Sequence, residues 1–292
     1  MEVKLSAEQS DLVQAVRGLL ERHRSSAQAP GPAQADLGAL EALERGGFTD
    51  IISSGGSAVD AVLVVEETAA LAPGAPAAGR ILVGPLVTGR DLPPVVALAE
   101  RAAGAITRFA SQAGVFLGLA DDLAWLADKS AAQIEPVASR WGYPVARVTV
   151  SGGDPLGPGS REALLNAWRI GLAAEAGGLM QAATLHASQY VTVRHQFGKP
   201  IGALQSIQHR LARAYVLSQG TKWLARQAAW DAGDPVAAAA AASYGAEGIR
   251  EVMSTTHQVC GAIGITDEFG LTAYTARLAM LQTELGGAIA HA

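Results

Sequence analysis

The sequence is poor in several residue types, and each shortage excludes a class of protein. It has one cysteine among 292 residues, so an internal disulfide cannot form and a reducing compartment is expected. Charged residues make up only 17%, which leaves room for large contacts between subunits. The formal net charge is -5, so there is no basic excess to neutralise the phosphates of a nucleic acid. Nucleic-acid binding is therefore not expected, while the 49% hydrophobic content indicates a folded chain.

The sequence also lacks the signals of a membrane protein and of a metalloprotein. Its alanine-rich stretch, 237–242, is far too short to span a bilayer, and Met1 to Lys4 contain no apolar signal-peptide core. We therefore expect a soluble cytoplasmic protein with no membrane partner. His257 and Cys260 are spaced like metal ligands, but no second pair completes a site, so no metal is expected.

Helical patterns dominate both ends of the chain, and short apolar runs occupy the middle. Apolar residues at helical spacing predict three helices before residue 78, at 7–23, from Leu37 to Gly46, and at 57–72. Between 80 and 150, short apolar runs separated by glycine, proline and acidic residues predict a small sheet, although 93–103 could equally form a helix. The runs are 81–83, 95–98, 115–117, 123–126 and 145–150.

The last part of the chain predicts four long antiparallel helices packed as a bundle. Gly and Pro residues interrupt an otherwise helical pattern, which gives segments 161–193, 204–231, 235–262 and 270–288. Trp223 and Trp230 are seven residues apart, so they share a helix face, and we expect them to serve as packing residues of the bundle.

The segment RHQFGKPIG, residues 194–202, follows the first bundle helix. A guanidinium offers a planar fork of donors that matches phosphate oxygens, and a glutamine one turn into the next helix adds amide donors. An alternative remains open, in which Arg194 only neutralises helix carbonyls and Phe197 is a core residue. The candidate cofactor-binding residues of this segment are Arg194, Gln196, Phe197, Gly198 and Gln205.

A second candidate segment spans residues 257–268, where glycines follow a helical pattern. Glycines at a helix end let a ligand approach the backbone and expose amide groups to it. An ordinary helix C-cap is the alternative for such a turn. The candidate cofactor-binding residues here are Gln258, Gly261 and Gly264.

The two segments resemble motifs of the acyl-CoA dehydrogenase family, R-x-x-F-G-K-x-(I/L)-x-x-x-Q and Q-x-x-G-G-x-G-(Y/F)-x-x-(D/E). They occur in the family's order, about 60 residues apart. In that family they contact the diphosphate and ADP portions of FAD bound to a neighbouring subunit, so the resemblance implies FAD and an oligomer. Ala262 replaces the second glycine of the pair, which is either tolerated or loosens the nucleotide contact.

The resemblance also implies the fold and the domain limits. We expect an acyl-CoA dehydrogenase-like chain with an N-terminal helical domain (1–78), a small, reduced middle β-domain (79–152) and a C-terminal four-helix bundle (153–292). The resemblance is strong in 160–270 and weak in 80–150.

Two elements of the family's chemistry are missing. In most members the catalytic glutamate lies about twenty residues past the second motif, and the matching position is Leu285, one residue from Glu284. The other known position for this base falls near Trp168, with Glu162 and Glu175 on either side. The family's flavin-facing segment, Y-x-x-T-E-x-x-x-G-S-D followed by W-I-(T/S), has no counterpart in the middle of the chain. No catalytic residue is therefore assigned.

The two FAD-contacting motifs are present, while the catalytic glutamate and the flavin-facing segment are missing. By the resemblance, this combination implies that the chain is the shorter, base-lacking subunit of a heteromer of α2β2 form. The partner would be a homologous subunit that carries the catalytic glutamate and the acyl-CoA pocket. Such heteromers act in actinobacterial steroid side-chain degradation, so a steroid-CoA thioester is expected from the resemblance alone. Two alternatives stay open: a self-sufficient dehydrogenase that uses Glu284, and a non-catalytic scaffold subunit without flavin.

Overall fold

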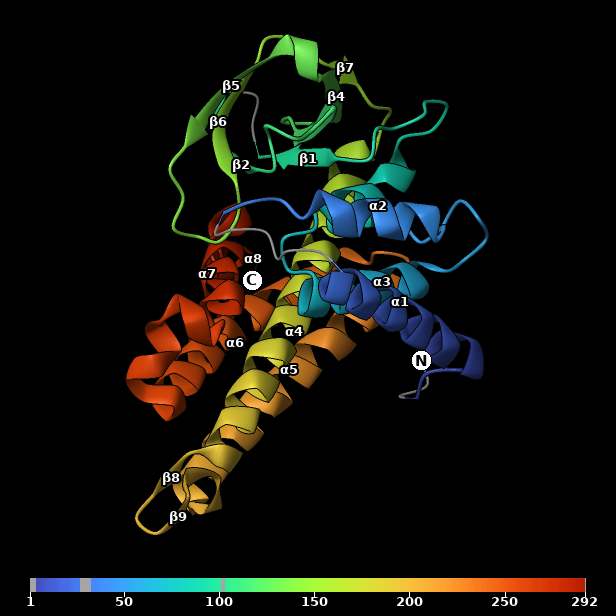
Figure 1. Ribbon diagram of the computed structural model, residues 1–292. Coiled ribbons are helices and arrows are strands. Elements are labelled where there is room, and N and C mark those ends of the chain that lie inside the picture. The colour runs from blue at the N-terminus through green and yellow to red at the C-terminus, as the bar shows by residue number, and fades with distance from the viewer. Residues whose placement is uncertain (1–3, 27–32, 101–102, 292) are drawn as a thin grey trace.

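A computed structural model describes residues 4–26, 33–100 and 103–291. Three parts follow one another along the chain: helices, a region of small sheets, and a long helical bundle (Figure 1). The sheets lie at one end of the bundle, and the N-terminal helices pack against its side. The bundle therefore projects away from the rest of the molecule, and its far end is a free tip.

Three N-terminal helices agree with the predicted segments. Helix α3 starts with a capping box, in which Ser57 Oγ accepts from the Asp60 amide and Asp60 Oδ2 accepts from the Ser57 amide. Asp36 likewise caps α2 by accepting from the Ala39 amide. The proline-, glycine- and alanine-rich composition of residues 27–35 predicts a linker, and part of it lies outside the described residues. The helices are α1 (Ala7–Ser26), α2 (Leu37–Arg45) and α3 (Ala58–Leu71).

The middle region contains two small sheets, with strand orders β1-β3-β4-β7 and β2-β6-β5. Four of the predicted runs form strands, but the run at 81–83 belongs to a helical turn, Gly79–Val83, so its prediction as a strand is wrong. Gly79 is required where this turn crosses β1, because a Cβ there would lie 2.3 Å from the Val96 carbonyl oxygen. The strands are β1 (Val96–Ala99), β2 (Ala103–Arg108), β3 (Val115–Leu119), β4 (Ala124–Asp128), β5 (Ala132–Val137), β6 (Val145–Val150) and β7 (Asp154–Pro155).

The C-terminal bundle confirms three of the four predicted helices. The fourth, 270–288, is wrong as a single helix, because α7 ends at Leu281 and a short turn, Glu284–Gly286, with Leu285 at φ 56°, precedes α8. A two-stranded hairpin, β8 (His195–Gln196) with β9 (Lys199–Pro200), connects α4 to α5. The helices are α4 (Ser160–Val193), α5 (Gln205–Trp230), α6 (Pro235–Cys260), α7 (Thr272–Leu281) and α8 (Ala288–His291).

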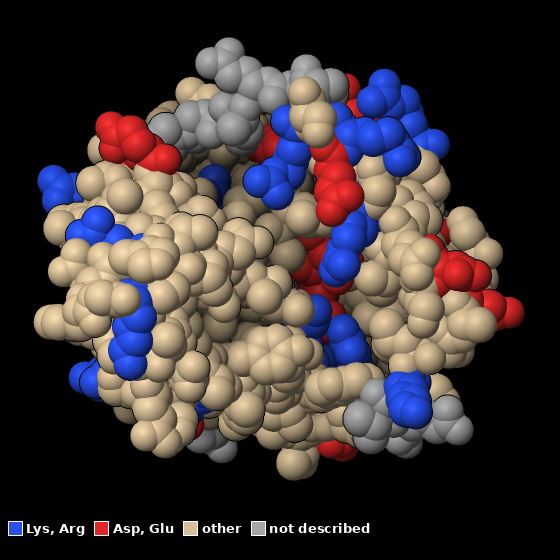
Figure 2. Space-filling view, turned by 60° about the horizontal axis from the view of Figure 1, so that its bottom comes forward, with Lys and Arg blue, Asp and Glu red and all other residues tan. Residues whose placement is uncertain are grey.

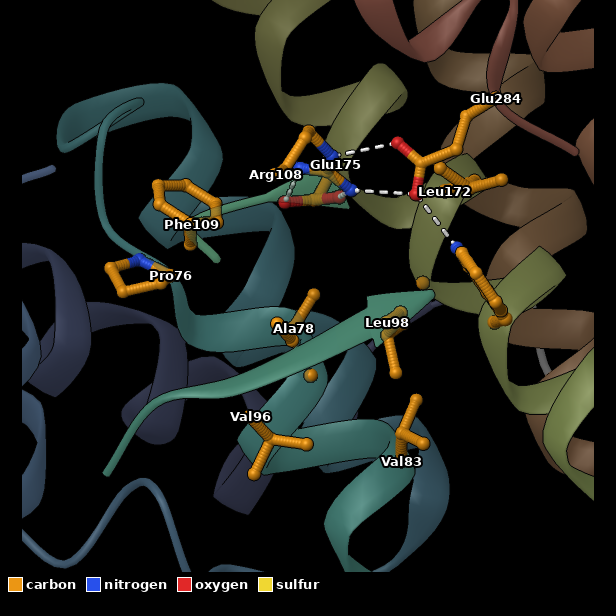
Figure 3. A pocket seen from close by; sticks show the side chains of 14 residues that line it. Pro76, Ala78, Val83, Val96, Leu98, Arg108, Phe109, Leu172, Glu175 and Glu284 are labelled. Atoms are coloured by element: carbon orange, nitrogen blue, oxygen red, sulfur yellow. Dashed lines mark hydrogen bonds and ion pairs between the residues drawn. The ribbon is translucent and has the colours of Figure 1, made fainter. Parts of the chain in front are cut away.

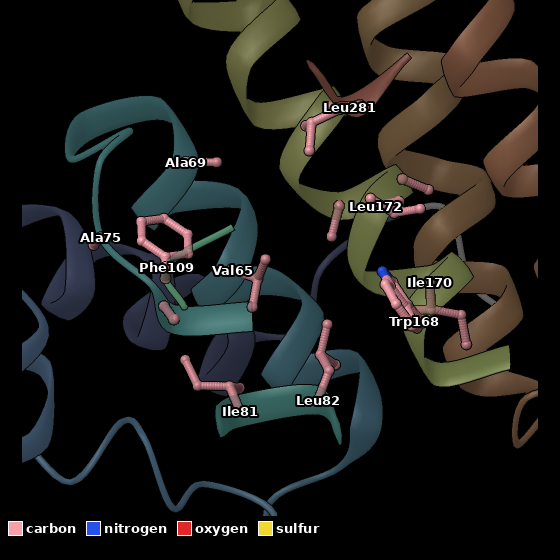
Figure 4. Packing of buried hydrophobic residues seen from close by; sticks show 14 of the residues in the cluster. Val65, Ala69, Ala75, Ile81, Leu82, Phe109, Trp168, Ile170, Leu172 and Leu281 are labelled. Carbon is pink, nitrogen blue, oxygen red and sulfur yellow. The ribbon is translucent and has the colours of Figure 1, made fainter. Parts of the chain in front are cut away.

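Apolar and ionic contacts join the N-terminal helices to the bundle. A continuous apolar core runs from α1 and α3 into α4, and part of it is drawn in Figure 4. At the α3–α4 crossing, a Cβ on Gly178 would lie 2.3 Å from the Glu66 carbonyl oxygen, so the helices meet at backbone distance. The buried Glu66 carboxylate accepts from Arg226 at 3.0 Å and pairs with Lys222 at 3.2 Å. These contacts make α3, α4 and α5 one rigid unit.

The two tryptophans of α5 have different environments. Trp223 stacks against the Arg226 guanidinium, 4.6 Å from its ring centroid. Trp230 is 62% exposed, so its prediction as a packing residue is wrong. The helix ends there, at the α5–α6 corner.

Candidate functional site

The first motif forms the tip of the bundle. Between β8 and β9 the chain turns through Phe197 (φ 55°) and Gly198 (φ 76°), the two positive angles of a tight hairpin. Phe197 is 86% exposed, which excludes the alternative that it is a core residue. An aromatic ring held outward at a strained backbone position indicates a surface that meets something outside this chain.

The polar side chains of this motif are free. Arg194, Gln196 and Gln205 are exposed, and within the described ranges no hydrogen bond or ion pair engages their side chains. Backbone bonds hold the segment in place, since the Arg194 amide donates to Tyr190 and the Ile201 amide donates to the Arg194 carbonyl. The result is a loop held by backbone bonds, in which the side-chain donors of Arg194, Gln196 and Gln205 are available.

The second motif caps α6 beside the first. Gln258 is exposed near the end of the helix, and Gly261 turns the chain at φ 64°. Gly264 is buried, and a Cβ there would lie 3.0 Å from the Cys260 Cβ. Ala262 is exposed with a negative φ, so its methyl group causes no strain within this chain.

One small apolar cluster joins the two motifs. Ile201 from the first motif packs against the cluster that contains Val259 and Cys260 from the second. The structure therefore brings the two predicted segments to the same end of the bundle. Figure 2 shows a face with this end turned forward, where acidic and basic side chains occur together around a hollow and much of the surface is uncharged.

Burial raises the pKa of Cys260 to about 11, so its thiol is protonated at neutral pH and a poor nucleophile.

A second candidate site lies inside the chain, between the sheet region and the bundle. Arg108, at the end of β2, donates to Glu284 at 2.7 Å and to Glu175 at 2.9 Å (Figure 3). Trp168 Nε1 donates to Glu284 Oε1 at 2.8 Å. The pocket is charged at this end and apolar at the other, where Val83, Val96 and Leu98 form the wall. Its free volume is about 30 Å³, which is room for about one water molecule.

This pocket includes one of the two positions at which the family resemblance places a catalytic base, and a neighbour of the other. Trp168 lines the pocket, and Leu285 follows Glu284 in the turn after α7. A one-residue offset on a helix would point Glu284 elsewhere, but 284–286 is not part of α7, so its carboxylate enters the pocket. Residue counting alone misses this placement. It also misses Arg108, because β2 was not among the predicted strands.

The electrostatics of the cluster are those of a buried structural network. Arg108, Glu175 and Glu284 are each about 10% exposed. Burial raises the pKa of Glu175, and the neighbouring Arg108 opposes that rise. The two carboxylates raise the pKa of Arg108 against the effect of burial, so the arginine stays charged. Glu284 accepts from two donors at 2.7 and 2.8 Å, which leaves it poorly placed to take a proton from a substrate.

Glu175→Gln is expected to weaken the pH dependence of stability. A raised folded-state pKa means that Glu175 favours folding at low pH and that this contribution is lost as pH rises above its unfolded value of about 4.3. Urea unfolding between pH 4.5 and 7.5 should show a smaller fall in the free energy of unfolding for the variant than for the wild type. If the free energy of unfolding falls equally with pH in the variant and the wild type, the inferred rise in the pKa of Glu175 is contradicted.

Comparison with known proteins gives a consistent result. The family model "Acyl-CoA dehydrogenase, C-terminal domain" matches residues 159–290. The acyl-CoA dehydrogenase FadE34 of Mycobacterium tuberculosis is 30% identical over 269 residues, or 82% of this chain and 38% of that protein. The structure superposes on the ChsE4-ChsE5 complex from Mycobacterium tuberculosis with a TM-score of 0.82, at 18% identity over 100% of this chain and 96% of that one.

These comparisons support the acyl-CoA dehydrogenase family for this chain, and the family model matches residues 159–290. A second structure, a variant of the Tcur3481-Tcur3483 steroid ACAD, also has a TM-score of 0.82, at 20% identity over 97% of this chain and 95% of that chain. At such identities the superpositions show the fold, which is that of acyl-CoA dehydrogenases. The chain spans less than two-fifths of the length of FadE34. The family indicates FAD as the cofactor.

The two sites differ in how well they fit FAD. At the bundle tip, Arg194, Gln205 and Gln258 present unpaired donors of the kind that hold a diphosphate. The internal pocket does not fit, because a cavity of about 150 Å³ is needed even for benzene, and about 30 Å³ is free here. The residues at the tip thus suit the nucleotide end of FAD, and the Arg108 pocket has no room for its ring.

None of the helices in the described ranges combines the length and the apolar character that crossing a bilayer requires. Within the same ranges, no three histidine, cysteine or acidic side chains come together as a metal site would need.

Proposed function

We propose that this chain is the non-catalytic subunit of a heteromeric, FAD-dependent acyl-CoA dehydrogenase of α2β2 form, acting in the cytoplasm. Its bundle tip holds the ADP and diphosphate end of FAD whose flavin lies in a homologous partner. The partner supplies the catalytic glutamate and most of the acyl-CoA pocket. When bound, the flavin accepts a hydride from the β-carbon of the acyl group.

The observation that carries this proposal is the contrast between the two sites. Arg194 and Gln205 are exposed and unpaired, as donors for a ligand on another subunit would be. Glu284, the nearest carboxylate to either expected base position, is instead held by Arg108 and Trp168 in a pocket of about 30 Å³. A site that receives acyl-CoA needs several times that volume.

The acyl substrate that we propose is a steroid side-chain CoA thioester. The Tcur3481-Tcur3483 protein is described as a steroid ACAD, and ChsE4-ChsE5 is described as a complex. The shared fold supports a test with a steroid side-chain CoA thioester before straight-chain acyl-CoAs.

The chain purified alone is expected to be colourless and inactive. Mixed with an acyl-CoA dehydrogenase homologue encoded beside it, the assembly should bind FAD and reduce an artificial electron acceptor. Flavin absorbance after gel filtration and dye reduction with the steroid-CoA thioester measure the two outcomes.

The matched variants are Glu284→Gln in this chain and a glutamine at the base position of the partner. The first should keep more than half of the activity of the assembly, and the second should abolish it. The self-sufficient alternative has one observation in its favour, since Glu284 does enter the pocket beside Trp168. An active, flavin-loaded assembly of this chain alone, inactivated by Glu284→Gln, would establish that alternative.

A further inference from the structure

A second pocket lies between the loop that joins β5 to β6 and the first two turns of α7. Figure 1 shows the sheet region reaching down to α7 on this side of the molecule. Gly142, at φ 70°, lets the loop pass close to the helix, because a Cβ there would lie 2.9 Å from the Arg277 Cγ. The pocket has a volume of about 420 Å³, which is in the range of small-molecule sites.

Arg277, which lines this pocket from α7, is a buried arginine with one nitrogen left to donate. The residue is 5% exposed. Its Nη1 donates to the Ala273 carbonyl at 2.6 Å, and its Nε is sealed from solvent without a partner. Its Nη2 has no hydrogen bond to any described residue and, unlike Nε, keeps contact with solvent. An occupant of the pocket can therefore accept a hydrogen bond from Nη2.

The charge of Arg277 is not neutralised within the described part of the chain. No carboxylate there lies within ion-pair distance, and the carboxylate whose charge reaches it is Asp36, which accepts from the Ala39 amide and lies 3.0 Å from His23 Nε2. Burial lowers the pKa of Arg277, whereas two carboxylates raise that of the equally buried Arg108. A buried cation without a counter-ion is costly, so an anion in the pocket would stabilise the protein.

Other groups of the wall also suit an anion. Arg140 is exposed at the pocket, and its guanidinium has no partner among the described residues. Ser139 Oγ accepts from the Trp141 amide and keeps its own O–H to donate. The first turn of α7 adds the positive end of a helix dipole. One acidic group, the exposed Asp267, opposes them, so two positive charges and one negative charge line the pocket.

This pocket is separate from both sites described above. It shares no lining residue with the Arg108 pocket, and it contains none of the candidate FAD-binding residues. Asp267 lies in the second motif segment, but it is not one of those candidates. An occupant therefore depends neither on FAD nor on acyl-CoA.

We propose that this pocket, lined by Ser139, Arg140 and Arg277, binds the phosphate group of a small molecule. The terminal oxygens of a phosphate can accept from Arg277 Nη2, the Arg140 guanidinium and the Ser139 hydroxyl at once, whereas a carboxylate has two oxygens. A volume of about 420 Å³ leaves room for the body of a phosphate ester beside the phosphate itself.

Glycerol 3-phosphate, glycerol and acetate are suitable probes, because they separate the phosphate from the body that carries it and from a smaller anion. Isothermal titration calorimetry of the chain alone, at constant ionic strength, should show glycerol 3-phosphate binding roughly tenfold tighter than acetate, the value of one more charge-assisted hydrogen bond. Glycerol should show no binding.

Arg277→Met should weaken glycerol 3-phosphate binding at least tenfold, because it removes the buried donor. The same variant removes a buried charge that has no counter-ion, so its melting temperature without ligand should be equal to or higher than that of the wild type. Arg140→Met should weaken binding only about two- to fivefold, because that guanidinium is exposed.

Two control variants remove an arginine elsewhere. Arg210→Met, at an exposed position of α5, and Arg194→Ala, at the bundle tip, should each leave the affinity for glycerol 3-phosphate within a factor of two. Loss of binding in Arg194→Ala would assign the phosphate to the tip and overturn the proposal. Absence of binding to the wild type, equal affinities for phosphate ester and acetate, or binding that survives Arg277→Met would do the same. Each measurement uses this chain without FAD or a partner, so a negative result leaves the proposed function untouched.

Discussion

Arg108→Met is expected to destabilise the protein by about 3–5 kcal/mol at pH 7.5, because it leaves two buried carboxylates without their shared cation. Glu175 and Glu284 are both less than one-tenth exposed, and Arg108 is the cation that contacts both of them. The loss should shrink towards pH 5, because burial raises the pKa of Glu175 and its protonation removes part of the uncompensated charge. Urea unfolding at the two pH values measures both effects.

Two further variants make this result specific. Combining Arg108→Met with Glu175→Gln and Glu284→Gln removes all three charges, and should recover more than half of the lost stability. Arg213→Met removes an arginine from an exposed pair with Glu251 and should cost less than about 1 kcal/mol. An Arg108 variant as mild as the Arg213 variant would show that the buried cluster contributes nothing to docking the sheets on the bundle.

Arg194→Ala is expected to weaken FAD binding by the assembled complex roughly ten- to hundredfold, the value of a charge-assisted, two-pronged contact to phosphate. The guanidinium has no partner among the described residues, so the melting temperature of the isolated chain should not change. Flavin content after dialysis of the complex against a series of FAD concentrations gives the affinity. Arg194→Lys keeps the positive charge but loses the planar pair of donors. Its FAD affinity should therefore lie between those of the wild type and of Arg194→Ala.

Arg210→Ala is the matched control, since Arg210 is also exposed, on α5, and lies outside the motif. It should leave the FAD affinity within a factor of two. Unchanged flavin content in the Arg194→Ala complex would contradict the role proposed for the tip and would favour a scaffold without flavin contacts.

Much of the architecture follows from local patterns in the sequence. The apolar spacing of the helical segments and the glycine and proline breaks between them predict α1 to α6 closely. Strand β2 was missed because its burial pattern is irregular and its pairing with β6 contains a bulge at Ala103 to Ala105. The turn at 81–83 was misjudged because a buried apolar run has no periodicity to distinguish strand from helix.

The charged cluster of the internal pocket cannot be predicted from local sequence patterns. Arg108, Glu175 and Glu284 come from three elements that are far apart along the chain, and tertiary packing alone brings them together. Local spacing places no carboxylate at either position of the family's base, but it cannot show that Glu284 enters the pocket beside Trp168. The tip motifs were easier to find, because each lies within one short segment.

Helix α4 connects the filled Arg108 pocket, which it reaches at Trp168, with the hairpin that follows it at Arg194. At about 1.5 Å per residue, the two ends are roughly 40 Å apart on one stiff rod. Substitutions that close the pocket therefore need not disturb the tip. Under the proposed function, a duplicated subunit that loses its catalytic residues keeps the FAD contact at its tip. This is a route by which an ancestral homo-oligomer becomes a hetero-oligomer with one catalytic and one non-catalytic subunit.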